Sequence, residues 1–158
     1  MKLLLILALA LSNYYGQLGL GDKIDRNIPT KINLPDNIKI KFITCSSGSS
    51  YIIDINDELW SFGNNKYGGL GLGGILNRNR NIPTKLINFK VKTVSSHGGH
   101  CLFIDMENIL WSFGNNNNGQ LGLGHFINKN IPTRVYIPDN MPVKDVYAGT
   151  YHNFIILK

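Results

Sequence analysis

The glycine-rich phrases of this chain are the first place where its residue types could do chemistry. Residues 16–21 read Gly-Gln-Leu-Gly-Leu-Gly, and such phrases can let backbone N–H groups surround a phosphate at the start of a helix. No Gly-Lys-Ser or Gly-Lys-Thr sequence follows, and no helical pattern opens after the phrase. The phrase returns at 68–73, with Gly69 in place of Gln, and again at 119–124, whereas a nucleotide site is needed once. We therefore interpret it as a structural turn whose glycines allow positive φ.

Aspartates and histidines also recur at equivalent positions instead of converging on one site. Asp54 and Asp105 each open an expected hairpin, so turn formation explains them better than a paired-carboxylate site. His100 and His152 are equivalent to each other, which predicts the same local hydrogen bond in two units. His97 and His100 have a His-x-x-His spacing on a turn, but no further ligand at a zinc-binding spacing accompanies them.

Tryptophans and cysteines complete the set of candidate site residues. Trp60 and Trp111 occupy the same position of the repeat, where packing within the core explains them better than an aromatic ligand cage. Cys45 and Cys101 form neither a Cys-x-x-Cys motif nor a zinc pattern, and we interpret them as small residues in or beside strands. No Ser/His/Asp set is evident. We therefore predict no catalytic, cofactor-binding or metal-binding residue, no enzymatic activity and no small-molecule substrate.

An internal repeat organises these residues. The heptapeptide Leu-Trp-Ser-Phe-Gly-Asn-Asn at 59–65 returns unchanged at 110–116. Asn-Ile-Pro-Thr occurs three times, at 27–30, 81–84 and 130–133. A period of about 51 residues, together with the glycine-rich phrases, indicates a repeat architecture. We divide the chain into residues 1–12, an apolar N-terminal segment, and 13–158, three repeats at approximately 13–59, 60–110 and 111–158.

Each repeat is expected to consist of short strands between turns. Residues 40–44 alternate apolar and polar types, and 51–53 form a short β-branched run, both typical of strands. Asn56 and Asp57 favour a hairpin turn before the returning strand at 59–62. The prolines that should mark the start of the outer strands are Pro29, Pro83 and Pro132. A period near 50 with about four strands predicts a β-propeller blade.

The phrase Trp-Ser-Phe-Gly-Asn-Asn, then three residues, then Gly-Gln-Leu-Gly-Leu-Gly, then Pro-Thr resembles the regulator of chromosome condensation repeat family. The resemblance covers about residues 13–158. It implies an all-β partial propeller of antiparallel four-stranded blades, in a family whose propellers have about seven blades and whose sequence repeats are offset from the blades. Members of the family act as exchange factors for small GTPases, as chromatin-docking proteins and as interaction domains. A small GTPase or chromatin is therefore a partner by resemblance only.

The chain departs from the family pattern at both ends. Residues 8–11, Ala-Leu-Ala-Leu, stand where the first repeat should carry Trp-Ser-Phe-Gly. Ser49 stands where the later repeats have histidine, and residue 158 falls within a repeat. Open blade faces would leave residues such as Trp111, Phe113 and Ile155 less protected than in an internal blade. We expect self-association through these edges, because head-to-tail contacts between identical units can close into a ring.

The N-terminus and the charge of the chain bear on its location and partners. Met1-Lys2 is followed by an apolar run at 3–11, with small-x-small patterns at 8–10 and 10–12, as in a secretory signal peptide; the alternative is that this segment replaces the lost strand. A cleaved signal would make the protein secreted; otherwise it is cytoplasmic or nuclear. The net charge is +6, but basic residues are spread singly, with the densest group at Arg78, Arg80 and Lys85, which disfavours a nucleic-acid partner.

We therefore predict a non-catalytic repeat protein that acts as a protein–protein interaction module for an unknown protein partner. Loops between strands on one face would form the binding surface, because loops can vary without disturbing the blades. Two alternatives stay open. The first is guanine-nucleotide exchange on, or regulation of, a small GTPase; the second is an inactive fragment of a larger propeller.

Overall fold

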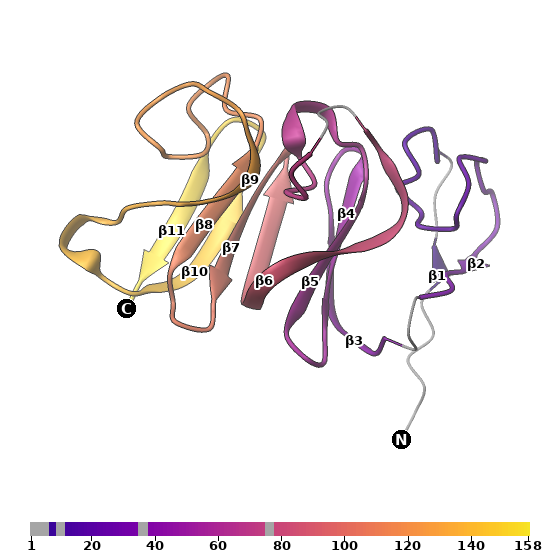
Figure 1. Cartoon of the computed structure of the whole chain (residues 1–158), viewed down its shortest axis with the longest axis horizontal. Coiled ribbons are helices and arrows are strands. Elements are labelled where there is room, and N and C mark those ends of the chain that lie inside the picture. Colours follow the sequence, from indigo (N-terminus) through magenta and orange to yellow (C-terminus); the bar gives the residue numbers. More distant parts are fainter. Residues whose placement is uncertain (1–6, 9–11, 35–37, 75–77) are drawn as a thin grey trace.

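The computed structural model describes residues 7–8, 12–34, 38–74 and 78–158, and within them the protein is built from antiparallel strands (Figure 1). The strands in chain order are β1 (Leu7–Ala8), β2 (Thr30–Lys31), β3 (Ile40–Cys45), β4 (Ser49–Asp54), β5 (Glu58–Gly63), β6 (Arg80–His97), β7 (His100–Asp105), β8 (Leu110–Gly114), β9 (Lys129–Arg134), β10 (Val143–Ala148) and β11 (Asn153–Leu157). The described helical segments are single 3₁₀ turns, η2 (Lys66–Gly68) and η3 (Pro138–Asn140). The all-β prediction is confirmed.

Two complete four-stranded blades share one long strand. In the first blade the order is β3, β4, β5 and the first half of β6; in the second it is the second half of β6, then β7, β8 and β9. Lys90 is the last residue of β6 to pair with β5, opposite Glu58, and Val91 is the first to pair with β7, opposite Asp105. The strand therefore leaves one blade and enters the next without a connecting loop.

Each end of the described chain carries part of a blade. β10 and β11 form a separate two-stranded sheet, and Val146 pairs with Ile155 there as Val94 pairs with Phe103 in the second blade. They therefore correspond to the two inner strands of a third blade. β1 and β2 form another pair, with Ala8 opposite Thr30. The fold is a partial propeller of two whole blades with partial blades on either side.

The apolar N-terminal segment falls largely outside the described residues. Leu7 and Ala8 are described, and they pair with Lys31 and Thr30. The segment thus pairs with the outer strand of the first repeat, but one residue out of the register expected from the alignment of Ala8 with Trp60, since Trp60 pairs with Lys85, the equivalent of Lys31. The signal peptide stays a prediction. Among the described residues, no helix has the length and apolar character needed to cross a lipid bilayer.

The core lies between neighbouring blades. Tyr51, Ile53 and Leu59 of the first blade pack against Phe103 and other residues of the second, in one buried cluster. A second cluster joins the second blade to β10; its buried members are Leu102, Ile104, Leu110, Val135, Val143 and Val146. Because both faces of β4 and β7 are covered, all six residues of each strand are buried. This burial explains their apolar, β-branched composition.

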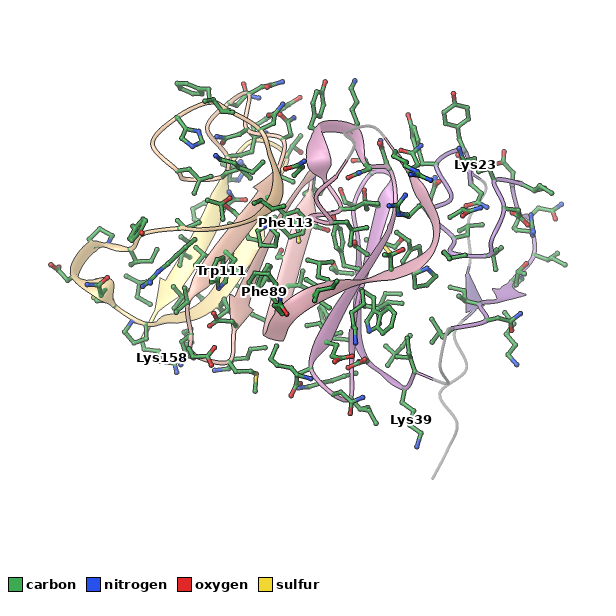
Figure 2. All side chains as sticks on the ribbon, viewed as in Figure 1. Lys23, Lys39, Phe89, Trp111, Phe113 and Lys158 are labelled. Carbon is green, nitrogen blue, oxygen red and sulfur yellow. The ribbon has the colours of Figure 1, made fainter. Side chains whose placement is uncertain are left out.

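Aromatic side chains fill the interface between the two complete blades (Figure 2). Phe89 lies edge-on to both Phe103 and Trp111, and Phe113 contacts Tyr51 across the interface. We expected Phe113 to lie on a poorly protected face, and that expectation is wrong. Phe113 is fully buried because its ring points into the cluster between the two complete blades.

The prolines lie deeper in the outer strands than we expected. Pro29 directly precedes β2, but Pro83 and Pro132 each lie three residues inside β6 and β9. The first half of β6 and the whole of β9 are the outermost strands of their blades, where an absent N–H faces away from the sheet. The pairing of β5 with β6 is irregular between Ser61 and Gly63, opposite the part of β6 that contains Pro83. Edge position therefore explains Pro83 and Pro132, whereas Pro29 stands directly before its strand, as we expected.

Candidate interaction face

The glycine-rich loops are each organised around one buried asparagine. The side-chain oxygen of Asn65 accepts the N–H of Leu70 at 3.1 Å, and that of Asn116 accepts the N–H of Leu121 at 2.9 Å. Asn13 does the same for Leu18 at 3.0 Å. These asparagines are 0–4% exposed. A buried amide of this kind fixes the loop because its loss would leave backbone groups unpaired.

A second set of contacts fastens each loop to the following repeat. The side-chain amide of Asn81 donates to the carbonyl of Gly21 at 2.6 Å, and that of Asn130 donates to Gly74 at 3.1 Å. In return, Gly21 N–H donates to the backbone oxygen of Asn81 at 2.9 Å, and Gly73 N–H to that of Asn130 at 2.8 Å. These reciprocal bonds hold the loops at fixed positions between blades.

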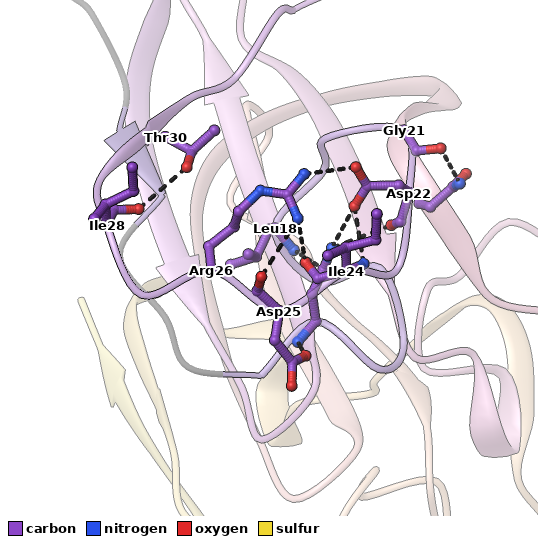
Figure 3. Close-up of polar contacts among 10 residues, drawn as sticks. Leu18, Gly21, Asp22, Ile24, Asp25, Arg26, Ile28 and Thr30 are labelled. Carbon is purple, nitrogen blue, oxygen red and sulfur yellow. Dashed lines mark hydrogen bonds and ion pairs between the residues drawn. The ribbon is translucent and has the colours of Figure 1, made fainter.

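The loop of the first repeat has an additional ionic anchor (Figure 3). The Arg26 guanidinium contacts the Asp22 carboxylate at 2.6 Å and donates to the carbonyl of Ile24 at 2.6 Å. The Ile24 N–H and then Arg26, both hydrogen-bonded to the Asp22 carboxylate, lower its pKa. Asp25 accepts the backbone N–H of Asn13 at 2.6 Å. The polar residues of this loop are therefore largely used within the loop.

Hairpin tips and loops from all three repeats meet around one open cleft of about 280 Å³. The tips join β3 to β4, β6 to β7, and β10 to β11. The residues lining the cleft are Ser46, Ser47, Gly48, Ser49, Asn64, Lys66, Tyr67, Gly98, Gly99, Asn115, Thr150 and Tyr151. We call the end of the molecule that holds these tips and the three glycine-rich loops the loop end. The residues of the cleft are mostly small and uncharged, with Lys66 its one charged side chain.

The loop end carries most of the net positive charge of the chain. Its described segments are 13–29, 46–49, 64–74, 78–81, 97–100, 115–130 and 149–152. Its basic residues are Lys23, Arg26, Lys66, Arg78, Arg80 and Lys129, and its acidic ones are Asp22 and Asp25. The whole chain has 16 basic and 10 acidic residues, so the rest of the molecule is close to neutral. A positive field at one end favours an acidic partner surface.

Asp54 and Asp105 lie at hairpin turns, as we predicted, and each also binds a tryptophan. One oxygen of Asp105 accepts the N–H groups of Glu107 and Ile109, and the other accepts Trp111 Nε1 at 2.7 Å. Asp54 makes the equivalent bonds, including one from Trp60 Nε1 at 3.0 Å. These bonds use both oxygens of each carboxylate. The two aspartates therefore stabilise the fold, at the end of the blades away from the loop end.

The histidines differ from our expectation. His100 is buried, and its Nε2 lies 2.9 Å from Asn153 Oδ1. His152 is exposed and packs edge-on against Phe154. The expected shared hydrogen bond is not found among the described residues, where His152 is exposed and no neighbouring blade covers it. Burial lowers the pKa of His100, opposed in part by its bond to Asn153. His97 pairs with His100 across a hairpin, and its Nδ1 lies 3.3 Å from the Thr150 hydroxyl.

The two cysteines lie in different environments. Cys45 is exposed at the end of β3, and Cys101 is fully buried in β7. Burial raises the pKa of the Cys101 thiol well above its usual value, which opposes the reactive thiolate form. Within the described ranges, no group of three or more His, Cys, Asp or Glu side chains is arranged to hold a metal ion.

In the middle repeat, a tyrosine from the neighbouring blade makes the hydrogen bond to the loop that Cys101 does not make. The carbonyl of Gln17 accepts the Ser50 hydroxyl at 2.8 Å, and that of Gln120 accepts the Asn153 amide at 2.5 Å. Cys101 is the equivalent residue of the middle repeat and bonds weakly to its own strand instead. There the Tyr51 hydroxyl donates to the carbonyl of Gly69. Burial raises the pKa of Tyr51 well above its usual value, so this phenol stays a donor.

Sequence reasoning did not identify the residues that hold the loop end together. Asn65 and Asn116 were part of a repeated phrase and Asn13 begins the first repeat, but their role as loop anchors was not predicted. Their recurrence at one repeat position was the signal that could have revealed it. Asn81 and Asn130, which link the repeats, recur in the same way before Ile-Pro-Thr.

Comparison with known proteins agrees with this architecture. The model of the regulator of chromosome condensation (RCC1) repeat matches residues 12–53, 56–104 and 107–156. The ultraviolet-B receptor UVR8 of Arabidopsis thaliana is 32% identical over 139 residues, which cover 87% of this chain and 32% of the receptor. The human X-linked retinitis pigmentosa GTPase regulator is 30% identical over 131 residues, which cover 80% of this chain and 12% of that protein.

Solved structures show the same fold. Prp20p of Saccharomyces cerevisiae, described with its binding properties to Gsp1p and histones, superposes with a TM-score of 0.81 at 25% identity, over 90% of this chain and 37% of that one. Human WBSCR16 superposes with a TM-score of 0.79 at 21% identity, over 92% of this chain and 38% of that one. The chain spans less than two fifths of these relatives. It belongs to the RCC1 repeat family and forms part of an RCC1-type β-propeller.

Proposed function

We propose that this protein is a non-catalytic interaction module that binds a protein partner through the loop end. The observation that carries the proposal is the convergence of three hairpin tips on one open cleft. The strands behind the tips repeat closely, whereas the tips differ: Ser-Ser-Gly at 46–48, His-Gly-Gly at 97–99 and Gly-Thr-Tyr at 149–151. A rigid scaffold that presents variable loops is typical of a recognition surface.

The chemistry of the loop end indicates the character of the partner. Lys66 is exposed at the rim of the cleft, and Arg78 is exposed on the adjoining loop. Neither makes an ion pair with the described residues. The Lys66 ammonium lies over the ring of Tyr67, 4.8 Å from its centroid. Exposed cations without a carboxylate partner among the described residues suit an acidic protein surface, and such contacts chiefly raise the association rate and the specificity.

The absence of catalysis is part of the proposal. The buried carboxylates Asp54 and Asp105 are fully used in turns, and the buried thiol Cys101 is disfavoured as a thiolate. Some relatives are named as ligases or kinases, but the chain covers only 7–14% of those proteins. The shared part is the repeat region.

Regulation of a small GTPase is the second candidate. It is supported by Prp20p, whose description names binding to Gsp1p and histones. The two candidate functions predict different results, because an exchange factor accelerates the release of bound guanine nucleotide from a GTPase and a simple binding protein does not. Release of a fluorescent guanine nucleotide from small GTPases, with and without this protein, separates them. An inactive fragment, the third alternative, would bind no partner in either assay.

The direct test is affinity purification with charge-reversal variants. Lys66→Glu with Arg78→Glu reverses two exposed charges at the loop end. Lys39→Glu with Lys144→Glu reverses two exposed charges near the opposite end and is the matched control. We expect partners that are retained by the control and lost with the loop-end variant. Equal retention by both variants would contradict the proposed face.

A further inference from the structure

Three equivalent segments of the repeats together carry the whole net charge of the chain. They are residues 22–31, 78–85 and 125–134, and we call them the outer rim. Each lies in the loop that follows a glycine-rich phrase and enters the outer strand of its repeat, β2, β6 or β9. Their net charge of +6 equals that of the whole chain, so the remaining residues are balanced in charge. The basic members are Lys23, Arg26, Lys31, Arg78, Arg80, Lys85, Lys129 and Arg134, and the acidic ones are Asp22 and Asp25.

The outer rim also exposes large apolar side chains. Six of them are 54–70% exposed: Ile24, Ile28, Ile82, Phe126, Ile127 and Ile131. Single exposed apolar residues are ordinary on protein surfaces. Here, however, they are concentrated on the same short segments that hold the net charge. The outer rim is therefore both cationic and apolar.

The same arrangement recurs in every repeat. A basic residue, Asn-Ile-Pro-Thr and a second basic residue occupy 26–31, 80–85 and 129–134. Core packing does not account for the central isoleucine, which is exposed in all three repeats. Ion pairing accounts for only two of the six flanking cations, because Arg26 contacts Asp22 and Lys85 contacts Glu58. The other four have no carboxylate partner among the described residues.

Contacts between successive repeats join these segments into one surface. A Cβ added to Gly21 would lie 3.9 Å from the side chain of Ile82, and one added to Gly73 would lie 3.2 Å from that of Ile131. Each isoleucine therefore lies beside the loop of the preceding repeat. The side-chain amides of Asn81 and Asn130 hold those loops in place.

We propose that the outer rim binds the surface of a membrane that contains anionic lipids. Its cations attract anionic headgroups, and the apolar side chains between them enter the boundary between headgroups and acyl chains. Phe126 and Ile127 are adjacent in the loop before β9 (Figure 1) and lie two residues from Lys129, so they supply the main apolar anchor. A nucleic-acid backbone would engage the cations and leave the isoleucines in water.

This membrane surface is distinct from the cleft at the loop end. None of the residues that line the cleft belongs to the outer rim. The membrane proposal therefore goes beyond the binding of a protein partner, and each can fail without the other.

The first test is co-sedimentation of the purified chain with lipid vesicles. The chain should bind vesicles made of equal parts phosphatidylcholine and phosphatidylserine. Vesicles of phosphatidylcholine alone should bind at least about tenfold more weakly, because they offer no anionic headgroups. Added salt should weaken binding to the anionic vesicles. Absence of binding to the anionic vesicles, or equal binding to both kinds, would refute the proposal.

Apolar variants locate the membrane-binding surface. Phe126→Ser with Ile127→Ser removes two exposed side chains from the outer rim and should weaken vesicle binding at least about tenfold. Ile55→Ser with Met106→Ser changes two exposed apolar residues of the hairpin turns away from the loop end and should leave binding unchanged. All four side chains are exposed, so thermal unfolding should be close to that of the unmodified chain. Equal vesicle binding by the two double variants would overturn the proposal.

Charge variants test the electrostatic part separately. Lys23→Gln with Arg134→Gln removes two exposed cations of the outer rim, and Lys39→Gln with Lys144→Gln removes two exposed cations near the opposite end. Only the first pair should weaken binding to anionic vesicles, although both variants have the same net charge. Equal weakening would assign the attraction to the net charge alone and contradict the proposed surface. A protein captured through Phe126 and Ile127, without any vesicle binding, would assign the outer rim to a protein partner instead.

Discussion

Asp105 shows how one side chain determines the geometry of a hairpin. Its carboxylate accepts two backbone N–H groups of the turn between β7 and β8 and the indole N–H of Trp111. The turn contains Asn108 at a φ of 64°, a conformation that asparagine tolerates better than most residues. A single buried carboxylate thus couples a turn to the aromatic packing between blades.

Removing this carboxylate should destabilise the protein. We expect Asp105→Ala to lower the free energy of unfolding by roughly 2–4 kcal/mol, because three hydrogen bonds to a buried carboxylate are lost together. Glu107→Ala at the same turn changes an exposed residue and should cost less than about 0.5 kcal/mol. Urea denaturation followed by tryptophan fluorescence measures both. Equal effects would show that turn propensity, and not the buried network, carries the stability.

His100 should make stability depend on pH in the near-neutral range. Burial lowers its folded-state pKa below the usual 6.5, so the unfolded chain takes up the proton first as the pH falls. The folded protein should therefore lose stability as the pH decreases through 6.5 and below, until the folded-state pKa is reached. Denaturation at pH 7.5 and pH 5.5 measures the change.

The matched variants for this effect are His100→Gln and His152→Gln. His100→Gln should reduce the loss of stability between the two pH values, whereas exposed His152→Gln should retain it. The opposite order would assign the effect to His152. The acidic groups with lowered pKa values, Asp22 and Glu58, contribute at lower pH.

At the scale of elements, the glycine-rich loop is where the repeats are joined. It needs positive φ at several glycines, with 69° at Gly71 and 70° at Gly74. The two positions differ in their surroundings. A Cβ at Gly71 would lie 2.9 Å from the ring of Phe113, whereas one at Gly74 would meet no atom within 4 Å. Both glycines are therefore needed for their positive φ, but only Gly71 is also needed because a side chain would not fit.

This pair of glycines allows the two requirements to be measured. Gly74→Ala should cost about 1–2 kcal/mol from the left-handed conformation alone. Gly71→Ala should cost about 1–3 kcal/mol more, since it also displaces a core aromatic ring. Thermal or urea denaturation of the two variants gives the difference. Similar costs would indicate that Phe113 moves aside without loss of packing.

The sequence allowed the main elements to be predicted, because the phrase Leu-Trp-Ser-Phe-Gly recurs with turn residues at fixed distances. Repetition establishes which residues are equivalent, but it does not show where one blade ends and the next begins. The change of partner between Lys90 and Val91 depends on tertiary pairing. His100 and His152 occupy equivalent positions of the repeat but differ in burial, because burial depends on whether a neighbouring blade covers the residue. The role of Asn65 depends on a loop closure that periodicity does not encode.

At the scale of the whole molecule, protection decreases from the central blades toward the β10–β11 sheet. β7 is paired on both sides, by β6 and β8. β11 is paired on one side only within the described residues. In repeat proteins each unit is stabilised chiefly by its neighbours, so the inner blade should be the last part to open.

Hydrogen exchange should reveal this gradient. We expect the amides of β7 to exchange much more slowly than those of β11, which lack partners on one side and lie near solvent. Mass spectrometry of peptic fragments covering the two strands measures the rates. Uniform protection across both strands would mean that β11 is covered in solution, either by another chain or by self-association.

The continuous strand β6 also bears on how such a protein can lengthen. A tandem duplication copies a stretch of sequence, and here that stretch begins in one blade and finishes in the next. The strands of an added copy would therefore pair with strands of the preceding copy in a shared sheet. Its inner strands extend one sheet and its outer strands extend another. Growth by duplication in this phase cannot produce a blade attached only by a tether, so the architecture preserves its connectivity at any number of copies.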